Sequence, residues 1–257
     1  MKSTLLILLL AFTLSSNAQS NDAPLVAVAS SLRYVWSSLM DKYPSADLPR
    51  VTFGSSGNLA RQITQGAPFQ LFLSADDSFP KWLRENGITN QEPVEYLEGK
   101  LVWVTKPGTP LAIWLLNDFG RNIGNPVLPE HIKRLAIANP RFAPYGVVAE
   151  QVLEVVDTNS SVKLTLGENA VQALQFSLSG ATDGGIVPKS LVSETARKKL
   201  PDLITVDVDT NLYSAVKHTM VFIGEPDQST QFLFDFLLSE TALFVFTQNG
   251  FDPVSTQ

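Results

Sequence analysis

The chain has 257 residues, of which 44% are hydrophobic and 17% charged, and this composition is typical of a folded globular protein. Its formal net charge is −6 and it has no basic run, which argues against a nucleic-acid partner. The absence of cysteine excludes thiolate metal sites, iron–sulfur clusters and a cysteine nucleophile, and the presence of only two histidines, His131 and His218, argues against a histidine-rich metal site.

The first 18 residues have the pattern of a secretory signal peptide. A basic start at Lys2 is followed by apolar residues 5–14, which are too few to span a bilayer, and then by small residues that favour cleavage after Ala18. A retained N-terminal anchor is the alternative, but no later stretch supports a membrane assignment. We therefore expect an exported, periplasmic protein.

The first predicted strand is residues 25–29, a continuous apolar run typical of a buried parallel strand. It ends at Ser30 and Ser31. The apolar residues that follow recur at helical spacing, which predicts an amphipathic helix over residues 31–43. The serine pair therefore lies between the end of a strand and the start of a helix.

The same arrangement recurs further along the chain. A short strand at residues 51–53 leads into a Gly-Ser-Ser-Gly-Asn turn at residues 54–58, then a helix, then another strand at residues 69–73. Backbone N–H groups at a helix N-terminus lack intrahelical partners and point toward an incoming anion. Ser55 and Ser56 add hydroxyl donors to this turn.

The two serine turns suggest one ligand site. If the two strands are neighbours in an open α/β sheet, Ser31 and Ser56 face the same crevice, at the carboxyl ends of the strands where such sheets bind ligands. For a single turn, an ordinary N-cap, in which serine satisfies the N–H groups of its own helix, is the simpler interpretation. The repetition favours a ligand site.

The remaining elements alternate in the same way. Asp76 and Asp77 are expected to cap a helix that runs to Gly87, with Trp82 and Leu83 on its inner face. The further predicted strands are residues 99–105, 134–138, 164–166, 184–187, 203–208 and 219–223. Predicted helices end at Val156, cover residues 170–178, and form a packed pair over residues 229–250, with Phe232, Phe236, Leu237 and Phe244 in the core. The segment from Pro107-Gly108 to about residue 130 is predicted to be irregular.

Several segments, in this order, resemble one known family. They are VAVASSL, FGSSGNLARQITQGAPFQLFLSAD, NPRFAPYGVVAEQVL, GENAVQALQF and GGIVPKS, and the resemblance covers essentially the whole mature chain. The chain resembles the periplasmic molybdate-binding proteins of molybdate ABC transporters. This resemblance implies an α/β protein with the two-lobed type II periplasmic-binding-protein fold and a ligand cleft between the lobes.

The resemblance also implies the ligand residues. It places serine hydroxyl ligands on Ser31 and Ser56, and backbone N–H donors on Tyr145 and Ala170. No side chain is expected to bind the metal atom directly, because these donors reach it through its oxygens. Some family members add a tyrosine hydroxyl after the glycine-rich strand. Pro188 stands at that position here, so that donor is absent or replaced.

The expected function follows from this resemblance. It implies a monomeric solute-binding protein, not an enzyme and without a cofactor, that captures molybdate and tungstate and delivers them to the permease and ATPase of an ABC importer. Neutral donors at helix N-termini could hold such a dianion without Lys or Arg, and a rigid cleft would select by ion size. We expect a signal peptide at residues 1–18, lobe 1 at 19–99 plus 212–257, and lobe 2 at 100–211.

Three alternatives remain open. One is a receptor for sulfate or phosphate. Phosphate would need an acceptor for its proton, such as Asp76 or Asp77. Another is a receptor for an organic solute, with an aromatic wall formed by Tyr34, Trp36 and Tyr145, although Trp36 also fits the apolar face of its helix.

The third alternative is a hydrolase with Ser31 or Ser56 as nucleophile. The sequence has no G-x-S-x-G elbow, and only His131 and His218 could act as the base. Each histidine is interpreted instead as a surface residue or as one whose hydrogen bonds are satisfied.

Overall fold

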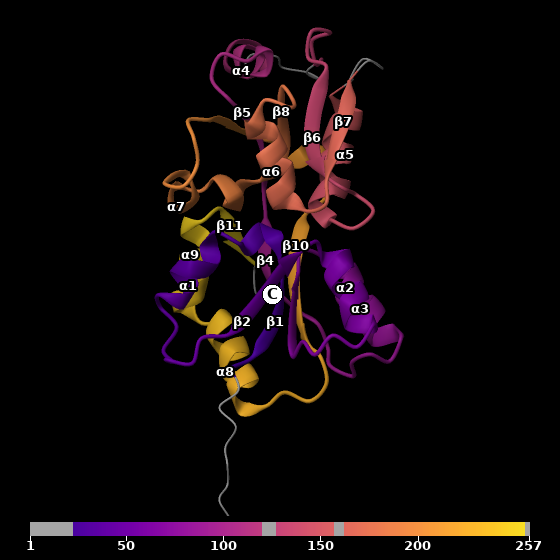
Figure 1. Ribbon diagram of the computed structural model, residues 1–257, viewed down its shortest axis with the longest axis vertical. Helices are drawn as coiled ribbons and strands as arrows, with labels where there is room; N and C mark the ends of the chain where they lie inside the picture. The colour runs from indigo at the N-terminus through magenta and orange to yellow at the C-terminus, as the bar shows by residue number, and fades with distance from the viewer. Residues whose placement is uncertain (1–22, 120–126, 157–161, 255–257) are drawn as a thin grey trace, which may run out of the picture.

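The protein consists of two α/β lobes that meet at a narrow waist (Figure 1). The computed structural model describes residues 23–119, 127–156 and 162–254. The predicted signal peptide, residues 1–18, and its cleavage after Ala18 lie outside the described residues. Each lobe contains one mixed sheet covered by helices. The lobe with the six-stranded sheet is called the first lobe, and the lobe with the five-stranded sheet is called the second lobe.

The first lobe is built on a sheet of six strands in the order β11-β4-β10-β3-β1-β2. Its strands are β1 (Leu25–Ala29), β2 (Arg50–Gly54), β3 (Leu71–Ser74), β4 (Val94–Gly99), β10 (Val216–Phe222) and β11 (Phe251–Pro253). Its helices are α1 (Val35–Met40), α2 (Ser56–Thr64), α3 (Ser78–Glu85), α8 (Gln228–Leu237) and α9 (Glu240–Gln248). Helices α2 and α3 lie to one side of this sheet, and α1, α8 and α9 lie to the other (Figure 1).

Strands β1 and β2 are parallel neighbours, which is the condition that a shared crevice for the two serine turns required. Ala29 pairs with Gly54 at the carboxyl end of both strands. The Ser30-Ser31 turn and the Ser55-Ser56 turn therefore leave the sheet side by side, at the edge that faces the second lobe.

The second lobe is built on a sheet of five strands in the order β7-β6-β8-β5-β9. Its strands are β5 (Leu101–Thr105), β6 (Arg134–Ala138), β7 (Lys163–Gly167), β8 (Gly184–Pro188) and β9 (Ile204–Asp207). Its helices are α4 (Pro110–Trp114), α5 (Pro144–Val155), α6 (Ala170–Ser179) and α7 (Glu194–Arg197), with a π-helical turn at Leu115–Phe119. Strand β6 is parallel to both β7 and β8, so α5 and α6 begin at the same sheet edge.

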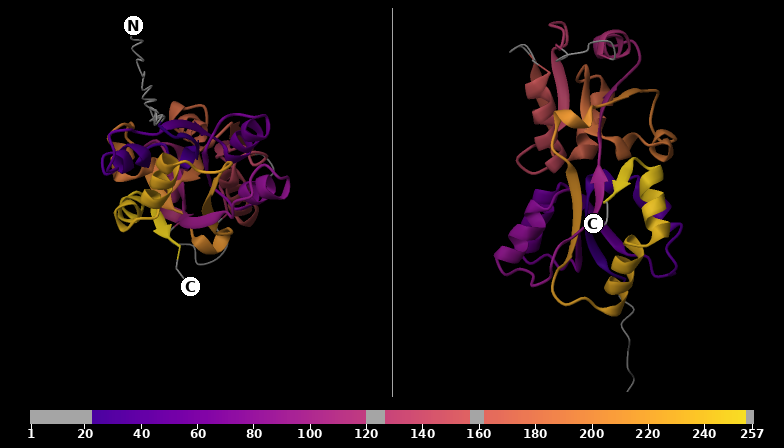
Figure 2. Two further views of the ribbon diagram at one scale, coloured as in Figure 1. Left: turned by 90° about the horizontal axis from the view of Figure 1, so that it is seen from below. Right: turned by 180° about the vertical axis from the view of Figure 1, so that it is seen from behind.

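The chain crosses the waist twice. Only Lys100 separates β4 of the first lobe from β5 of the second, and the return crossing lies between β9 and β10. Figure 2 shows the two connections running close together between the lobes. The lobe bounds expected from the sequence, 19–99 plus 212–257 and 100–211, stay a prediction.

The structure corrects several predicted elements. The helix predicted over residues 31–43 is instead a 3-10 turn at Ser30–Leu32 followed by α1, because the Arg33 N–H donates to the Ser30 carbonyl three residues back. The strand predicted at 99–105 starts at Leu101, and β4 before it was missed. Helix α4 lies in the segment predicted to be irregular, and strand β11 was also missed.

Three aromatic residues predicted to be inside lie on the surface. Trp82, Phe232 and Phe244 are 42%, 43% and 65% exposed. Each helix buries only one stripe against its sheet, and in α8 and α9 that stripe is filled by other residues, among them Leu233, Phe236, Leu237, Val245 and Phe246. Phe236 and Leu237 are in the core as predicted.

Among the described residues, no single helix is long and apolar enough to cross a membrane. Helices α8 and α9 meet the length and composition criteria only when taken together, and they are bent by 54° relative to each other.

Gly146 leads to the first prediction, because the start of α5 packs directly on backbone. A Cβ at Gly146 would lie 2.2 Å from the carbonyl oxygen of Ala138 at the end of β6. We expect Gly146→Ala to lower the free energy of unfolding by about 1–3 kcal/mol in urea titrations, because rigid backbone must move. Val147→Ala, at the exposed next residue of the same helix, serves as the control and should change stability by less than about 0.5 kcal/mol. Equal stability of the two variants would contradict this packing.

Candidate functional site

A small cavity lies where the two lobes meet. It is enclosed by Ala29, Ser30, Ser31, Gly54, Ser55, Ser56 and Ala75 of the first lobe and by Ala143, Pro144, Tyr145 and Ala170 of the second. The structure therefore brings together all four residues that the resemblance selected, Ser31, Ser56, Tyr145 and Ala170. The space between them admits about one water-sized sphere.

Three helices begin at this cavity. Helix α2 starts at Ser56, α5 at Pro144 and α6 at Ala170. The first-turn N–H groups of a helix lack intrahelical acceptors, and the helix dipole gives this end a partial positive charge. None of the described residues that line the cavity carries a charge. The cavity is thus suited to an anion held by neutral donors.

Two serine hydroxyls in the cavity have nothing to bind. The Oγ atoms of Ser31 and Ser55 are buried and have no hydrogen-bond partner among the described residues. A buried unpaired hydroxyl lowers stability, so its presence calls for an explanation. The ligand positions implied by the resemblance omit Ser55. The serine pair in the turn before α2 was the sequence signal for it.

Other polar lining groups are partly engaged. The Ser56 hydroxyl accepts a hydrogen bond from the Ala75 N–H at 3.0 Å, so its own hydrogen is left to donate. The Ala170 N–H donates to the Ser30 hydroxyl at 3.2 Å, which joins the two lobes across the cavity. Tyr145 follows Pro144 in the first turn of α5, where an N–H has no intrahelical acceptor.

Direct contacts between the lobes close the rim of the cavity. The Gly57 N–H donates to the Phe142 carbonyl at 2.8 Å, and the Ser190 hydroxyl donates to the Ser31 carbonyl at 2.8 Å. A Cβ at Gly57 would lie 3.1 Å from the Phe142 backbone and 2.8 Å from the Phe79 ring. Glycine is therefore what permits this close approach. Pro188 has no side-chain donor, as expected from the sequence. Ser190, two residues later, has a hydroxyl, and this hydroxyl donates to the Ser31 carbonyl.

The acidic pair before α3 does not line the cavity. Asp76 accepts hydrogen bonds from the hydroxyls of Ser74, at 2.6 Å, and Ser78, while burial raises the pKa of its carboxyl. The hydrogen bond from Lys81 lowers the pKa of Asp77. Asp77 is the N-cap residue as predicted, but its side chain makes no capping hydrogen bond.

The aromatic wall that a receptor for an organic solute would need is not formed. Trp36 is buried in the first-lobe core, where its ring meets Phe53 edge-on at 6.2 Å. Tyr34 packs against an apolar cluster of the second lobe. Of the three predicted aromatic residues only Tyr145 borders the cavity, and its hydroxyl points to His218 instead of to a solute.

The two histidines differ in their surroundings. His131 is exposed, as one of the predicted possibilities allowed. His218 is fully buried, and its Nδ1 has no partner among the described residues, so the prediction of a surface or satisfied histidine was wrong for it. Its Nε2 lies 3.2 Å from the Tyr145 hydroxyl. Neither histidine lines the cavity, so neither is placed as a base for Ser31 or Ser56.

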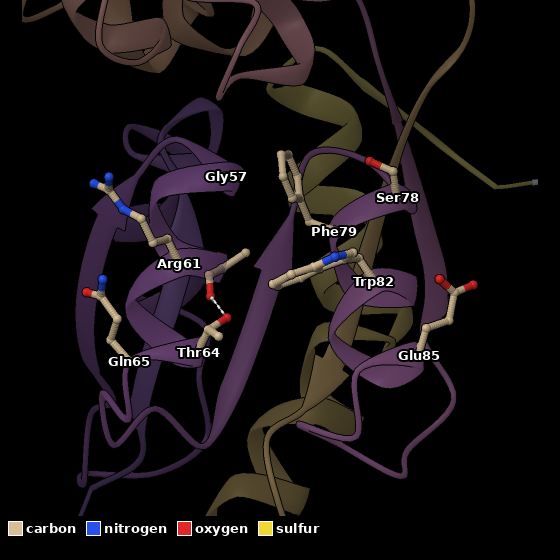
Figure 3. A pocket seen from close by; sticks show the side chains of 9 residues that line it. Gly57, Arg61, Thr64, Gln65, Ser78, Phe79, Trp82 and Glu85 are labelled. Carbon is tan, nitrogen blue, oxygen red and sulfur yellow. Dashed lines mark hydrogen bonds between the residues drawn. The ribbon is translucent and has the colours of Figure 1, made fainter.

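A second, larger groove of about 570 Å³ runs between α2 and α3 on the first lobe. Figure 3 shows Phe79 and Trp82 pointing into the space between the helices, whereas Arg61 and Glu85 point away from it. This position explains the exposure of Trp82. Because the groove walls are mainly apolar, the groove lacks the converging donors found in the interlobe cavity.

The comparisons with known proteins agree with this geometry. Residues 24–252 match the family model described as bacterial extracellular solute-binding protein. The chain is 35% identical to the molybdate-binding protein ModA of Azotobacter vinelandii over 78% of this chain and 77% of that one. It is 33% identical to ModA of Rhodobacter capsulatus over 77% and 75%. These relatives confirm the resemblance predicted from the sequence.

A solved structure confirms the predicted type II periplasmic-binding-protein fold. The periplasmic molybdate-binding protein of Azotobacter vinelandii superimposes with a TM-score of 0.73 at 24% identity, covering 91% of this chain and 100% of that one.

The buried imidazole leads to a prediction of pH-dependent stability. Burial lowers the pKa of His218 to about 3, against about 6.5 in the unfolded chain. Between these values the unfolded chain binds a proton that the folded protein does not bind. The free energy of unfolding should therefore fall, as the pH falls, by up to about 1.4 kcal/mol per pH unit.

Urea titrations at several pH values, on the wild type and on His218→Gln, test this prediction. The variant should show a shallower dependence between about pH 4 and pH 6, because its side chain does not titrate there. The comparison of slopes cancels the contributions of carboxyl groups such as Asp77, which both proteins retain. Identical slopes would show that His218 does not bind a proton on unfolding.

Proposed function

The chain belongs to the family of bacterial extracellular solute-binding proteins, and we propose that its solute is molybdate, with tungstate as a second ligand. The family binds solutes and does not catalyse reactions, so the chain is not an enzyme. The observation that supports molybdate most directly is the cavity between the lobes, in which unpaired neutral donors converge and no charged residue takes part. Two relatives at 33% and 35% identity are named as molybdate-binding proteins.

The proposed ligand set has five members. Ser31, Ser55 and Ser56 supply hydroxyl hydrogens, and Tyr145 and Ala170 supply backbone N–H groups. A hydrogen bond to a charged group contributes about 1.5–3 kcal/mol, so several such bonds can offset much of the desolvation of a dianion. For Ala170 to take part, its N–H must exchange the Ser30 hydroxyl for the ion.

The size of the cavity implies that the lobes move. A tetrahedral oxyanion is larger than the single water-sized space between the lining residues, so it can enter only if the rim contacts open and the lobes then close around it. We propose that this movement captures the ion in the periplasm and presents a closed surface to the permease and ATPase of an ABC importer. Export by a signal peptide cleaved after Ala18 belongs to the same proposal.

Sulfate or phosphate is the second candidate, because the same donors suit any oxyanion. A protonated phosphate needs an acceptor in the cavity, and neither Asp76 nor Asp77 lines it. Sulfate would have to be rejected by size, since an ion too small for a rigid set of donors leaves some of them unpaired. The hydrolase alternative is excluded by the family.

Isothermal titration calorimetry of residues 19–257 with four oxyanions tests the proposal. We expect one-to-one, submicromolar binding of molybdate and tungstate, and sulfate and phosphate at least about a hundredfold weaker. Tight binding of sulfate or phosphate without molybdate would retain an oxyanion receptor but reject the proposed ligand. If no oxyanion binds the folded protein, the proposed function is wrong.

Serine-to-alanine variants test the ligand set. Ser31→Ala and Ser55→Ala should each weaken molybdate binding by about 10- to 150-fold, the range expected for one hydrogen bond to a charged group. They should not destabilise the ligand-free protein, because each removes a hydroxyl that is already unpaired. Ser37→Ala, at an exposed site on α1, is the matched control and should bind like the wild type. Wild-type affinity in Ser55→Ala would remove Ser55 from the ligand set.

A further inference from the structure

The side chain of Tyr145 connects the second lobe to the first-lobe sheet. Its hydroxyl lies 3.2 Å from Nε2 of His218 on β10, and both side chains are buried. The two rings also meet edge-on, with their centroids 5.8 Å apart. Because Tyr145 is the second residue of α5, this contact holds the first turn of the helix that borders the cavity.

The first lobe makes room for the tyrosine hydroxyl. A Cβ at Gly99, the last residue of β4, would lie 1.8 Å from the Tyr145 hydroxyl oxygen. Gly99 pairs with Val216 of β10 and precedes Lys100, where the chain enters the second lobe. The hydroxyl therefore lies at the waist, beside β4 and β10, the two first-lobe strands at which the chain leaves and re-enters that lobe.

The burial of His218 is not explained by a gain in stability. If His218 Nε2 accepts the tyrosine hydrogen, Nδ1 carries a proton that has no acceptor among the described residues. If Nε2 donates instead, Nδ1 is an acceptor without a donor. The rings of Tyr96 and Phe251 surround the imidazole edge-on, and burial of an unsatisfied nitrogen among them lowers stability in either tautomer.

We propose that Tyr145 and His218 are positioning residues for anion binding, and that their contact anchors the first turn of α5 to β10 so that the Tyr145 N–H points into the cavity. This inference rests on the proposed function, which makes that N–H a ligand donor. His218 does not line the cavity and acts only through Tyr145. The position of the Tyr145 N–H thus depends on a contact made by the hydroxyl of the same residue.

Calorimetry with molybdate on four variants tests this inference. The variants are Tyr145→Phe, His218→Gln, the double variant and the control Tyr213→Phe. Tyr145→Phe keeps the ring and the backbone N–H and removes only the contact with His218. Each single variant should weaken binding by about tenfold, and the double variant by no more than either single, because both remove the same contact.

Tyr213→Phe is the matched control because it also removes a buried interaction of a tyrosine hydroxyl at the waist. That hydroxyl accepts a hydrogen bond from the Leu101 N–H at 3.1 Å, and Tyr213 does not line the cavity. Its affinity should stay within about twofold of the wild type, even if its stability falls.

Amide hydrogen exchange over residues 143–147 gives a second measurement, which does not depend on ligand. Exchange in the ligand-free protein should be faster in Tyr145→Phe and His218→Gln than in the wild type, and unchanged in Tyr213→Phe.

Wild-type affinity in Tyr145→Phe, or independent losses that multiply in the double variant, would overturn the inference while leaving the proposed function intact. If wild-type protein binds no oxyanion, the proposed function and this inference fail together. If His218→Gln does not fold, the affinities of Tyr145→Phe and Tyr213→Phe for molybdate are compared, and only a loss confined to Tyr145→Phe supports the inference.

Discussion

In the proposed function, burial of an anion without a cation is the constraint on which the arrangement of this site depends. The charge must be met by hydrogen-bond donors, and the fold has to keep those donors free of partners of their own until the ion arrives. The buried, unpaired hydroxyls of Ser31 and Ser55 fulfil this condition. They stay available because each serine follows the end of a parallel strand, where the chain turns into a helix and the sheet no longer offers acceptors.

The same constraint explains why two lobes are needed. A single sheet edge supplies donors from one side only, and the first turns of α5 and α6 supply the opposite side. For the two edges to meet, backbone has to approach backbone. Gly57 permits this approach, because its N–H donates to the Phe142 carbonyl at 2.8 Å and a Cβ at this position would lie only 3.1 Å from the Phe142 backbone. The fit between the lobes at the rim therefore depends on the missing side chain of Gly57 as well as on hydrogen bonds.

The sequence predicted most of the strands and the two serine turns, because continuous apolar runs and serine turns are local signals, but it left open whether β1 and β2 are neighbours. It did not predict the exposure of Phe232 and Phe244, since which stripe of a helix is buried depends on its partner. The family resemblance selected four residues that the structure places around one cavity, Ser31, Ser56, Tyr145 and Ala170. Their roles as ligands stay a prediction. His218 could not be placed beside Tyr145, because the two residues lie in different lobes and only the tertiary structure joins them.

The unsatisfied groups around the waist are of two kinds. Ser31 and Ser55 line the cavity, so in the proposed function a bound oxyanion satisfies their hydroxyls and stabilises the folded protein by mass action. His218 Nδ1 does not face the cavity, and no ligand there relieves its lost hydrogen bond. The unpaired Nδ1 therefore lowers the stability of the folded protein whether or not a ligand is bound. Such a cost is expected where geometry matters more than stability, which agrees with the proposed positioning role of the Tyr145–His218 contact, even though the Tyr145 ring also belongs to a buried apolar cluster.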